Sequence, residues 1–119
     1  MIIGTGIDIV EISRIRKLVD SQPRFPERVL TEKERETYLK YKERRAIEFL
    51  AGRWAAKEAF SKAKGTGIGK ELSFTDIEIA NDSHGRPVVL KPLMEGVHLS
   101  ISHSEHYAIA QVIIEKVVY

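Results

Sequence analysis

FLAGRWAAKEAFSKAKGTGIG, residues 49–69, has the pattern of a long helix that ends in a glycine run. Small and aromatic residues recur in it at steps of three and four, which places them on one stripe suited to close packing. That stripe consists of Phe49, Gly52, Ala56, Ala59, Phe60 and Ala63. A second face gathers Trp54, Glu58, Ser61, Lys62 and Gly65. The glycine run predicts the helix end, with backbone N–H groups left open to a ligand.

The second face contains a carboxylate one turn before an ammonium, Glu58 and Lys62. Such a pair on an exposed helix is often only a surface ion pair worth about 0.2–0.5 kcal/mol. The alternative is a chemical site. The glycine run follows its helix, whereas a phosphate-binding P-loop precedes one, so a helix C-cap at Gly65 is the default interpretation.

Composition limits the function classes. At 119 residues the chain is most simply one domain, residues 1–119, with a core of its own. A net charge of +2 with 30% charged residues is too balanced for a typical nucleic-acid binder. The chain has no cysteine, hence no disulfide, and it shows neither a signal peptide nor an apolar run of membrane length. We therefore expect a soluble cytoplasmic protein without a membrane span.

Residues 1–10 predict a first strand, because isoleucine and valine dominate them. Gly4 and Gly6 indicate a bulge or a close approach of another element. Asp8 interrupts the apolar run between Ile7 and Ile9. Its carboxylate either points to solvent from the polar face of an edge strand or serves as a metal or substrate ligand on a rigid element.

Two shorter helices are expected before the long one. Ser13 is a candidate cap of the first, whose stripe Ile12, Ile15, Leu18 and Val19 leaves Arg14, Arg16 and Lys17 outside. Prolines make residues 23–26 an irregular connection. Residues 31–34, Thr-Glu-Lys-Glu, form a capping box that opens the second helix. The charged residues 42–45 predict a solvated turn.

Beyond Gly69 the apolar period changes from 3.6 to 2. Residues 74–79 and 87–90 flank a turn-rich segment and predict one hairpin, and residues 97–102 and 107–114 predict a second. The expected fold class is α+β: an antiparallel sheet, including the first strand, packed against a long helix and two shorter helices. His103 and His106 have H-x-x-H spacing, but nothing specifies the further ligands that zinc requires.

Two separate signals combine into a family resemblance. Residues 6–8, Gly-Ile-Asp, and residues 54–62, WAAKEAFSK, together resemble the paired signature of the 4′-phosphopantetheinyl transferases, in particular the small bacterial type. The similarity extends over nearly the whole chain and includes residues 28–31, 49–54, 65–69, 85–87 and 99–103.

The resemblance implies an enzyme that transfers the 4′-phosphopantetheine group of coenzyme A to a serine of an apo acyl carrier protein in fatty acid biosynthesis. Adenosine 3′,5′-bisphosphate would be released. It implies Asp8, Glu58 and Lys62 as catalytic residues, with Mg²⁺ held by Asp8 and Glu58. Mg²⁺ prefers oxygen ligands and keeps several waters, so two carboxylates suffice when a pyrophosphate supplies the rest. Lys62 would carry the second positive charge.

The same resemblance implies further contacts and an assembly. The residues expected to bind coenzyme A are Arg53, Ser61, Lys62, Lys64, Gly65, Gly85, Arg86, Pro87 and His103, with Arg53 and His103 near its 3′-phosphate. Acyl carrier proteins are strongly acidic, so the basic residues Arg14, Arg16 and Lys17 are the expected docking surface. A homotrimer with sites between subunits is also implied.

Two questions stay open at this point. The general base is Glu58, a water at the metal, or a carboxylate of the partner. The rival function is a non-catalytic module that binds an acidic protein or nucleic acid through its basic helices. Against nucleic acid, no aromatic residues are interleaved with the basic ones.

Overall fold

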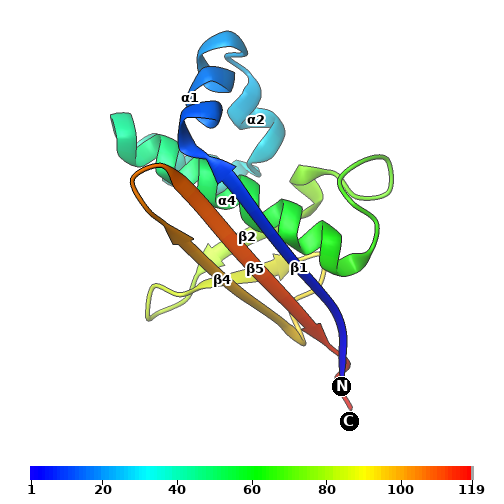
Figure 1. Cartoon of the computed structure of the whole chain (residues 1–119). Coiled ribbons are helices and arrows are strands. Elements are labelled where there is room, and N and C mark those ends of the chain that lie inside the picture. Colours follow the sequence, from blue (N-terminus) through cyan, green and yellow to red (C-terminus); the bar gives the residue numbers. More distant parts are fainter. Residues whose placement is uncertain (119) are drawn as a thin grey trace.

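A long central helix lies against a three-stranded antiparallel sheet in the computed structural model, which describes residues 1–118 (Figure 1). The helix is α4 (Glu43–Lys64), and the strand order of the sheet is β1-β5-β4. These strands are β1 (Ile2–Glu11), β4 (Val97–His103) and β5 (Tyr107–Glu115). The first strand joins the antiparallel sheet, as the sequence predicted, and its partner is β5.

The remaining elements are three short helices and a separate hairpin. These helices are α1 (Ile12–Ser21), α2 (Phe25–Val29) and α3 (Glu32–Lys40). A 3-10 helix, η1 (Phe74–Asp76), precedes the two-stranded sheet of β2 (Glu78–Asn81) and β3 (Pro87–Lys91). The α+β class and both hairpins are confirmed. Described residues 1–118 include no helix long and apolar enough to cross a membrane.

Four details of the predicted elements are wrong. Residues 25–29 are a helix rather than an irregular connection, because a proline in the first helical turn lacks only an N–H that would be unpaired there. Residues 74–76 form η1 instead of a strand, because Asp76 accepts from the Ser73 N–H and closes the turn. The strands divide into two sheets. Residues 43–45 belong to α4, where Arg45 stacks over the Tyr41 ring at 4.8 Å.

Strand β1 lies unusually close to α4. A Cβ atom added at Gly4 would overlap the carbonyl group of Ala63, and one at Gly6 would overlap that of Ala59. Only glycine allows this approach, which confirms the close contact predicted from the sequence. The alternation of the strand then turns Asp8 toward α4, while Ile7 and Ile9 are more than half exposed on the other face.

Helix ends follow the predictions in two places and depart from them in two. Thr31 and Glu34 form the predicted capping box, and Gly65 ends α4 with φ 84°. Ser13 is not a cap, because the chain passes directly from β1 into α1 and the Ile12 N–H donates to the His106 carbonyl. The N–H groups of residues 65–67 donate to the Lys62 and Ser61 carbonyls, so they are not open to a ligand.

Candidate active site

Asp8 of β1 and Lys62 of α4 meet where the strand crosses the helix. The Lys62 Nζ donates to the Asp8 Oδ1 at 2.9 Å and to the Ile7 carbonyl oxygen at 3.0 Å. The Asp8 side chain is only 12% exposed, and its Oδ2 is buried without a hydrogen-bond partner among residues 1–118. Asp8 is therefore not a solvent-facing residue of an edge strand, and it keeps an unused acceptor.

Glu58 joins this cluster from one turn earlier on α4. Partial burial raises the pKa of Glu58, the negative charge of Asp8 raises it further, and the charges of Lys62 and Arg14 oppose the rise. Lys62 pairs with Asp8 of the neighbouring strand, so the spacing of Glu58 and Lys62 does not amount to a simple surface ion pair. The structure thus brings together the three side chains predicted to be catalytic.

The chemistry of these groups fits a hard divalent cation. Two carboxylates raise each other's energy when both are ionised, and a cation between them removes that repulsion. The Asp8 Oδ2, which has no hydrogen-bond partner among residues 1–118, would supply an oxygen ligand. Among residues 1–118 no cluster of three or more His, Asp or Glu could hold a metal, so the remaining ligands would come from phosphate and water, as Mg²⁺ prefers.

One of the predicted docking residues, Arg14, lies close enough to this cluster for its charge to act on Glu58. The Arg14 guanidinium lies 5.6 Å from the centre of the Trp54 ring, which itself packs near Phe74. Arg14 and Lys17 line a hollow of about 380 Å³ that also includes Ser13 and the half-exposed Tyr107. Arg16 is exposed on the same helix. Two of the three basic residues therefore share one concave surface.

A second hollow, of about 220 Å³, lies along the first half of α4. Its lining includes three residues predicted to bind coenzyme A and seven others. The predicted ones are Arg53, Pro87 and His103. The others are Tyr41, Arg45, Glu48, Phe49, Gly52, Asn81 and Ile101. Aromatic rings and guanidinium groups thus face the same space, which we name the basic cavity.

Arg53 is the most enclosed charge of the basic cavity. It is 7% exposed, its guanidinium lies 4.6 Å from the centre of the Phe49 ring, and its Nη2 donates to the Asn81 Oδ1 at 2.7 Å. Burial lowers the pKa of Arg53 from its usual range. Phe49 and Gly52 were predicted only to pack, and Arg45 only to lie in a solvated turn. No sequence pattern indicated that all three line one cavity.

The other predicted ligand residues are spread over the surface. The Ser61 side chain is fully buried and its hydroxyl donates to the Glu58 carbonyl, so this hydroxyl faces no ligand space. Lys64, next to Gly65, lines a separate hollow of about 580 Å³ together with Lys91. Arg86, between Gly85 and Pro87, pairs with Asp82. A single chain does not gather these residues at one place.

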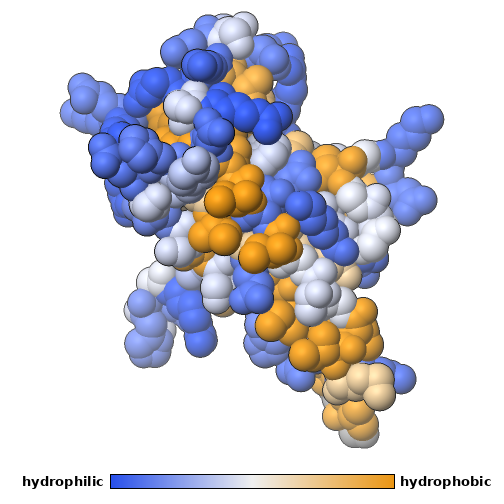
Figure 2. Space-filling model, in the orientation of Figure 1, coloured by the Kyte–Doolittle hydropathy of each residue, from blue (hydrophilic) through white to orange (hydrophobic). Residues whose placement is uncertain are grey.

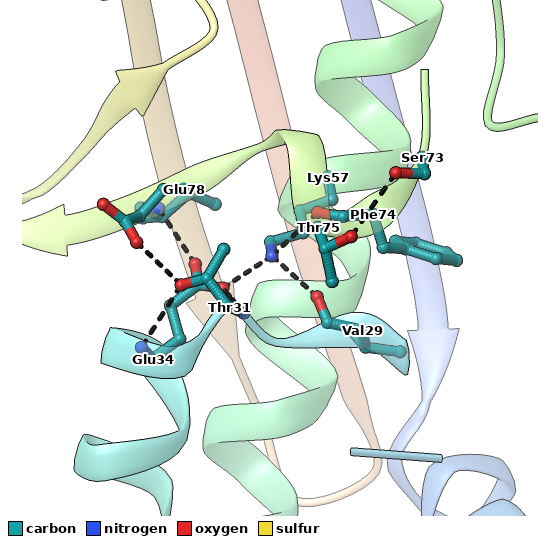
Figure 3. Close-up of polar contacts among 9 residues, drawn as sticks. Val29, Thr31, Glu34, Lys57, Ser73, Phe74, Thr75 and Glu78 are labelled. Carbon is teal, nitrogen blue, oxygen red and sulfur yellow. Dashed lines mark hydrogen bonds and ion pairs between the residues drawn. The ribbon is translucent and has the colours of Figure 1, made fainter. Parts of the chain in front are cut away.

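The sequence interpretation missed a buried ion pair on the opposite side of α4 (Figure 3). The Lys57 Nζ is fully buried and donates to the Glu34 Oε1 at 2.6 Å, to the Val29 carbonyl at 2.6 Å and to the Phe74 carbonyl at 3.0 Å. One sequence signal existed, since Lys57 follows Leu50 by seven positions and precedes Phe60 by three, on an apolar face.

Comparisons with known proteins identify the family of the chain. The model of the 4′-phosphopantetheinyl transferase superfamily matches residues 4–112. The chain belongs to this superfamily, which confirms the resemblance found in the sequence. Within it, the chain is 58% identical over 117 residues to a holo-[acyl-carrier-protein] synthase of Anoxybacillus flavithermus, covering 98% of both chains.

Solved structures give the same result. A holo-(acyl-carrier-protein) synthase from Bacillus anthracis in complex with CoA (3′,5′-ADP) superimposes with a TM-score of 0.92 at 55% identity, over 98% of this chain and 99% of that one. The enzyme of the same name from Neisseria meningitidis gives a TM-score of 0.88 at 36% identity, over 98% and 100% of the two chains.

Proposed function

We propose that this chain transfers the 4′-phosphopantetheine group of coenzyme A to a serine of an apo acyl carrier protein and releases adenosine 3′,5′-bisphosphate. The observation that carries the proposal is the cluster of Asp8, Glu58 and Lys62, joined across β1 and α4. It occurs in a chain that closely resembles holo-[acyl-carrier-protein] synthases. A role in fatty acid biosynthesis and a cytoplasmic location stay predictions from the sequence.

In the proposed reaction, a serine hydroxyl forms a bond to the β-phosphorus of coenzyme A, and the bond from that phosphorus to the bridging oxygen breaks. The barrier of such a transfer falls mainly through positioning and through neutralisation of phosphoryl charge. Asp8 and Glu58 would hold Mg²⁺, which supplies a Lewis acid for the pyrophosphate oxygens. Lys62 places an ammonium beside the same oxygens. Partial burial and the charge of Asp8 raise the pKa of Glu58, which makes its carboxylate a stronger base for the proton that the serine hydroxyl releases.

The basic cavity suits the nucleotide part of coenzyme A. A guanidinium presents a fork of donors that matches phosphate oxygens, and Arg53 and Arg45 both face this space. Tyr41 and Phe49, with ring centres 5.5 Å apart, provide apolar walls. We assign the 3′-phosphate to the Arg53 and His103 side of the cavity.

Arg14 is the strongest candidate for contact with the carrier protein. It stacks on Trp54 and its charge reaches Glu58, so a protein bound there would present its serine close to the cluster. Lys17 extends the positive surface along the hollow. An acidic partner gains encounter rate from such a surface.

A trimer with sites between subunits is the proposed assembly. The outer face of the sheet exposes Ile3, Ile7, Ile9, Tyr107 and Ile109, and Figure 2 shows apolar residues along the diagonal of β1 and β5. Exposed apolar side chains gathered on one face are typical of protein interfaces. Lys64 and His103 border separate hollows within one chain, and a second copy would bring such residues together. Sedimentation equilibrium at micromolar concentration tests this assembly.

Mass spectrometry tests the function directly. An apo acyl carrier protein incubated with coenzyme A, Mg²⁺ and this chain should gain the mass of one phosphopantetheine group, and its serine-to-alanine variant should not. Addition of a chelator should stop the reaction. The rival function, a non-catalytic binder of acidic polymers, predicts no mass change. It also predicts no rise in melting temperature with coenzyme A and Mg²⁺ together.

A further inference from the structure

The buried ion pair reaches beyond α4. The Glu34 Oε1 accepts from Lys57 and from the Thr31 N–H at 2.8 Å, while its Oε2 accepts from the Ile79 N–H of β2 at 2.9 Å. Thr31 donates its hydroxyl to the Glu78 carboxylate at 2.8 Å. Figure 3 shows these groups converging from α3, α4 and the start of β2. Glu34 therefore fastens β2 to the middle of α4.

The same strand carries the residue that holds Arg53. Asn81, the last residue of β2, accepts from the Arg53 Nη2 and donates its Nδ2 to the Gly85 carbonyl at 2.7 Å. Arg53 and Lys57 lie one turn apart on α4. Two hydrogen-bonded connections thus join α4 to β2. The first connection runs from Lys57 through Glu34 to Ile79, and the second runs from Arg53 to Asn81.

The position of the Arg53 guanidinium depends on its hydrogen bond to Asn81. Asn81 provides its only hydrogen bond within residues 1–118, and the Arg53 Nε is buried without an acceptor there. The ring of Phe49 supports the guanidinium plane but does not fix its rotation, because stacking on a ring lacks the direction of a hydrogen bond. A shift of β2 would therefore release Arg53.

We propose that Glu34 and Lys57 are positioning residues of the basic cavity. They hold β2 so that Asn81 keeps Arg53 in the place where it meets the 3′-phosphate of the nucleotide. The pair thereby determines how strongly the protein distinguishes a nucleotide with this phosphate from one without it. This inference rests on the proposed function, since it takes the basic cavity as the nucleotide site.

Calorimetric titration with adenosine 3′,5′-bisphosphate and with AMP measures that distinction. A charged hydrogen bond to one phosphate should make the wild-type chain bind the bisphosphate about tenfold more tightly. In Glu34→Gln the amide keeps one oxygen but turns a donor toward the Ile79 N–H or toward Lys57. Its preference should fall to about threefold. In the charge-balanced double variant E34Q/K57M the preference should disappear.

Two controls separate positioning from loss of stability. Ile114→Val removes a methylene from the buried part of β5 and should leave the preference unchanged. Asn81→Ala should abolish the preference by itself, and adding Glu34→Gln to it should cause no further loss, because both act along one route.

The outcomes are distinct. If the wild-type chain shows no preference, both the nucleotide assignment of the cavity and this inference are wrong. If the wild-type chain shows the preference and Glu34→Gln keeps it in full, the nucleotide assignment stands and the positioning role is wrong. Equal weakening of both ligands, or additive effects of Glu34→Gln and Asn81→Ala, also overturns the positioning role. Because E34Q/K57M leaves neither charge of the buried pair alone, it decides the question even if Glu34→Gln fails to fold, and a full preference in it would overturn the positioning role.

Discussion

Two sides of α4 each present a lysine to a carboxylate of another element, Lys57 to Glu34 of α3 and Lys62 to Asp8 of β1, and they differ in how many partners these groups have. Lys57 is fully buried with three acceptors, and both oxygens of its partner Glu34 accept hydrogen bonds. On the other side Lys62 is half exposed and the Asp8 Oδ2 has no partner within residues 1–118. We call the Lys57–Glu34 side saturated, because its charged groups all have hydrogen-bond partners. We call the Lys62–Asp8 side unsaturated, because the Asp8 Oδ2 can still accept a ligand.

The difference separates a structural from a functional use of the same groups. A buried charge is tolerated only when its donors and acceptors are satisfied, and the Lys57 side meets that condition. Burial lowers the pKa of Lys57, and the Glu34 carboxylate opposes that change. On the other side, partial burial and the nearby negative charge of Asp8 raise the pKa of Glu58. Perturbed groups with unused acceptors are typical of active sites.

The largest expected effect comes from breaking the saturated side. Lys57→Met should lower the free energy of unfolding by about 3–5 kcal/mol, because Glu34 is left as an uncompensated buried charge. Lys62→Met is the matched control on the other side, and because Lys62 is half exposed it should cost no more than about 1 kcal/mol. Urea unfolding measures both. Equal losses would contradict the distinction between the two sides.

The second prediction removes a ligand from the unsaturated side. Asp8→Asn should lower kcat about 10²–10³-fold, as expected when a group that stabilises transition-state charge is lost. The melting temperature should change little, because the amide oxygen of the variant can still accept from the half-exposed Lys62 and the charge repulsion with Glu58 is removed. Carrier-protein modification and thermal unfolding are measured on the same preparation. Normal turnover of the variant at low Mg²⁺ would exclude Asp8 as a metal ligand.

The third prediction concerns Lys62, whose ammonium is proposed to meet charge that develops during the transfer. Lys62→Ala should lower kcat about 10–100-fold and weaken coenzyme A binding much less. Lys62→Arg should restore activity only in part, because a planar fork replaces a point charge. Steady-state kinetics and calorimetry separate the two effects. A variant that changes only the KM for coenzyme A would make Lys62 a binding residue.

The sequence predicted the unsaturated side well and the saturated side not at all. The resemblance to the family signature named Asp8, Glu58 and Lys62, and the structure places them together. The residues alone left a surface ion pair and a solvent-facing Asp8 as alternatives. Glu34 fits a capping box, which explains the residue completely at the level of sequence. Its second role depends on β2, which lies more than forty positions later, and no local pattern reports such a contact.

The fold shows the same limit. Periodicity predicted both hairpins and the long helix, because these depend on neighbours in the sequence. It did not predict that the strands divide into two sheets, since that depends on packing between distant segments. It also left the direction of Asp8 open. The close approach of Gly4 and Gly6 to α4 decides that direction, because it sets which face of β1 is covered.

The fourth prediction tests the basic surface of Arg14 and Lys17 on the unsaturated side. Arg14→Glu should raise the KM for the carrier protein about fivefold at low salt, the scale of an exposed charge pair, and leave coenzyme A binding unchanged. Lys17→Glu should do less, since Arg14 is the one stacked on Trp54. Both effects should shrink as salt rises. Kinetics with each substrate varied separately is the measurement. An unchanged KM in Arg14→Glu would place the docking surface elsewhere.

The smallest expected effect is a gain of stability on the unsaturated side. Because the folded-state pKa of Glu58 is raised, the folded chain keeps this proton to higher pH than the unfolded chain does. The free energy of unfolding should therefore fall as pH rises from the usual value of 4.5 through the raised value, and the loss is complete above it. Glu58→Gln has no proton to lose and should not show this decline. At neutral pH it should be slightly more stable than the wild-type chain, with the gain limited by solvent screening of a half-buried group.

Urea unfolding at several pH values measures the difference, with the exposed Glu71→Gln as control. If the pH profiles of wild type and Glu58→Gln superimpose, Asp8 and Glu58 do not repel each other in the folded chain. A more stable Glu58→Gln that has lost turnover would show that this side of α4 gives up stability for function.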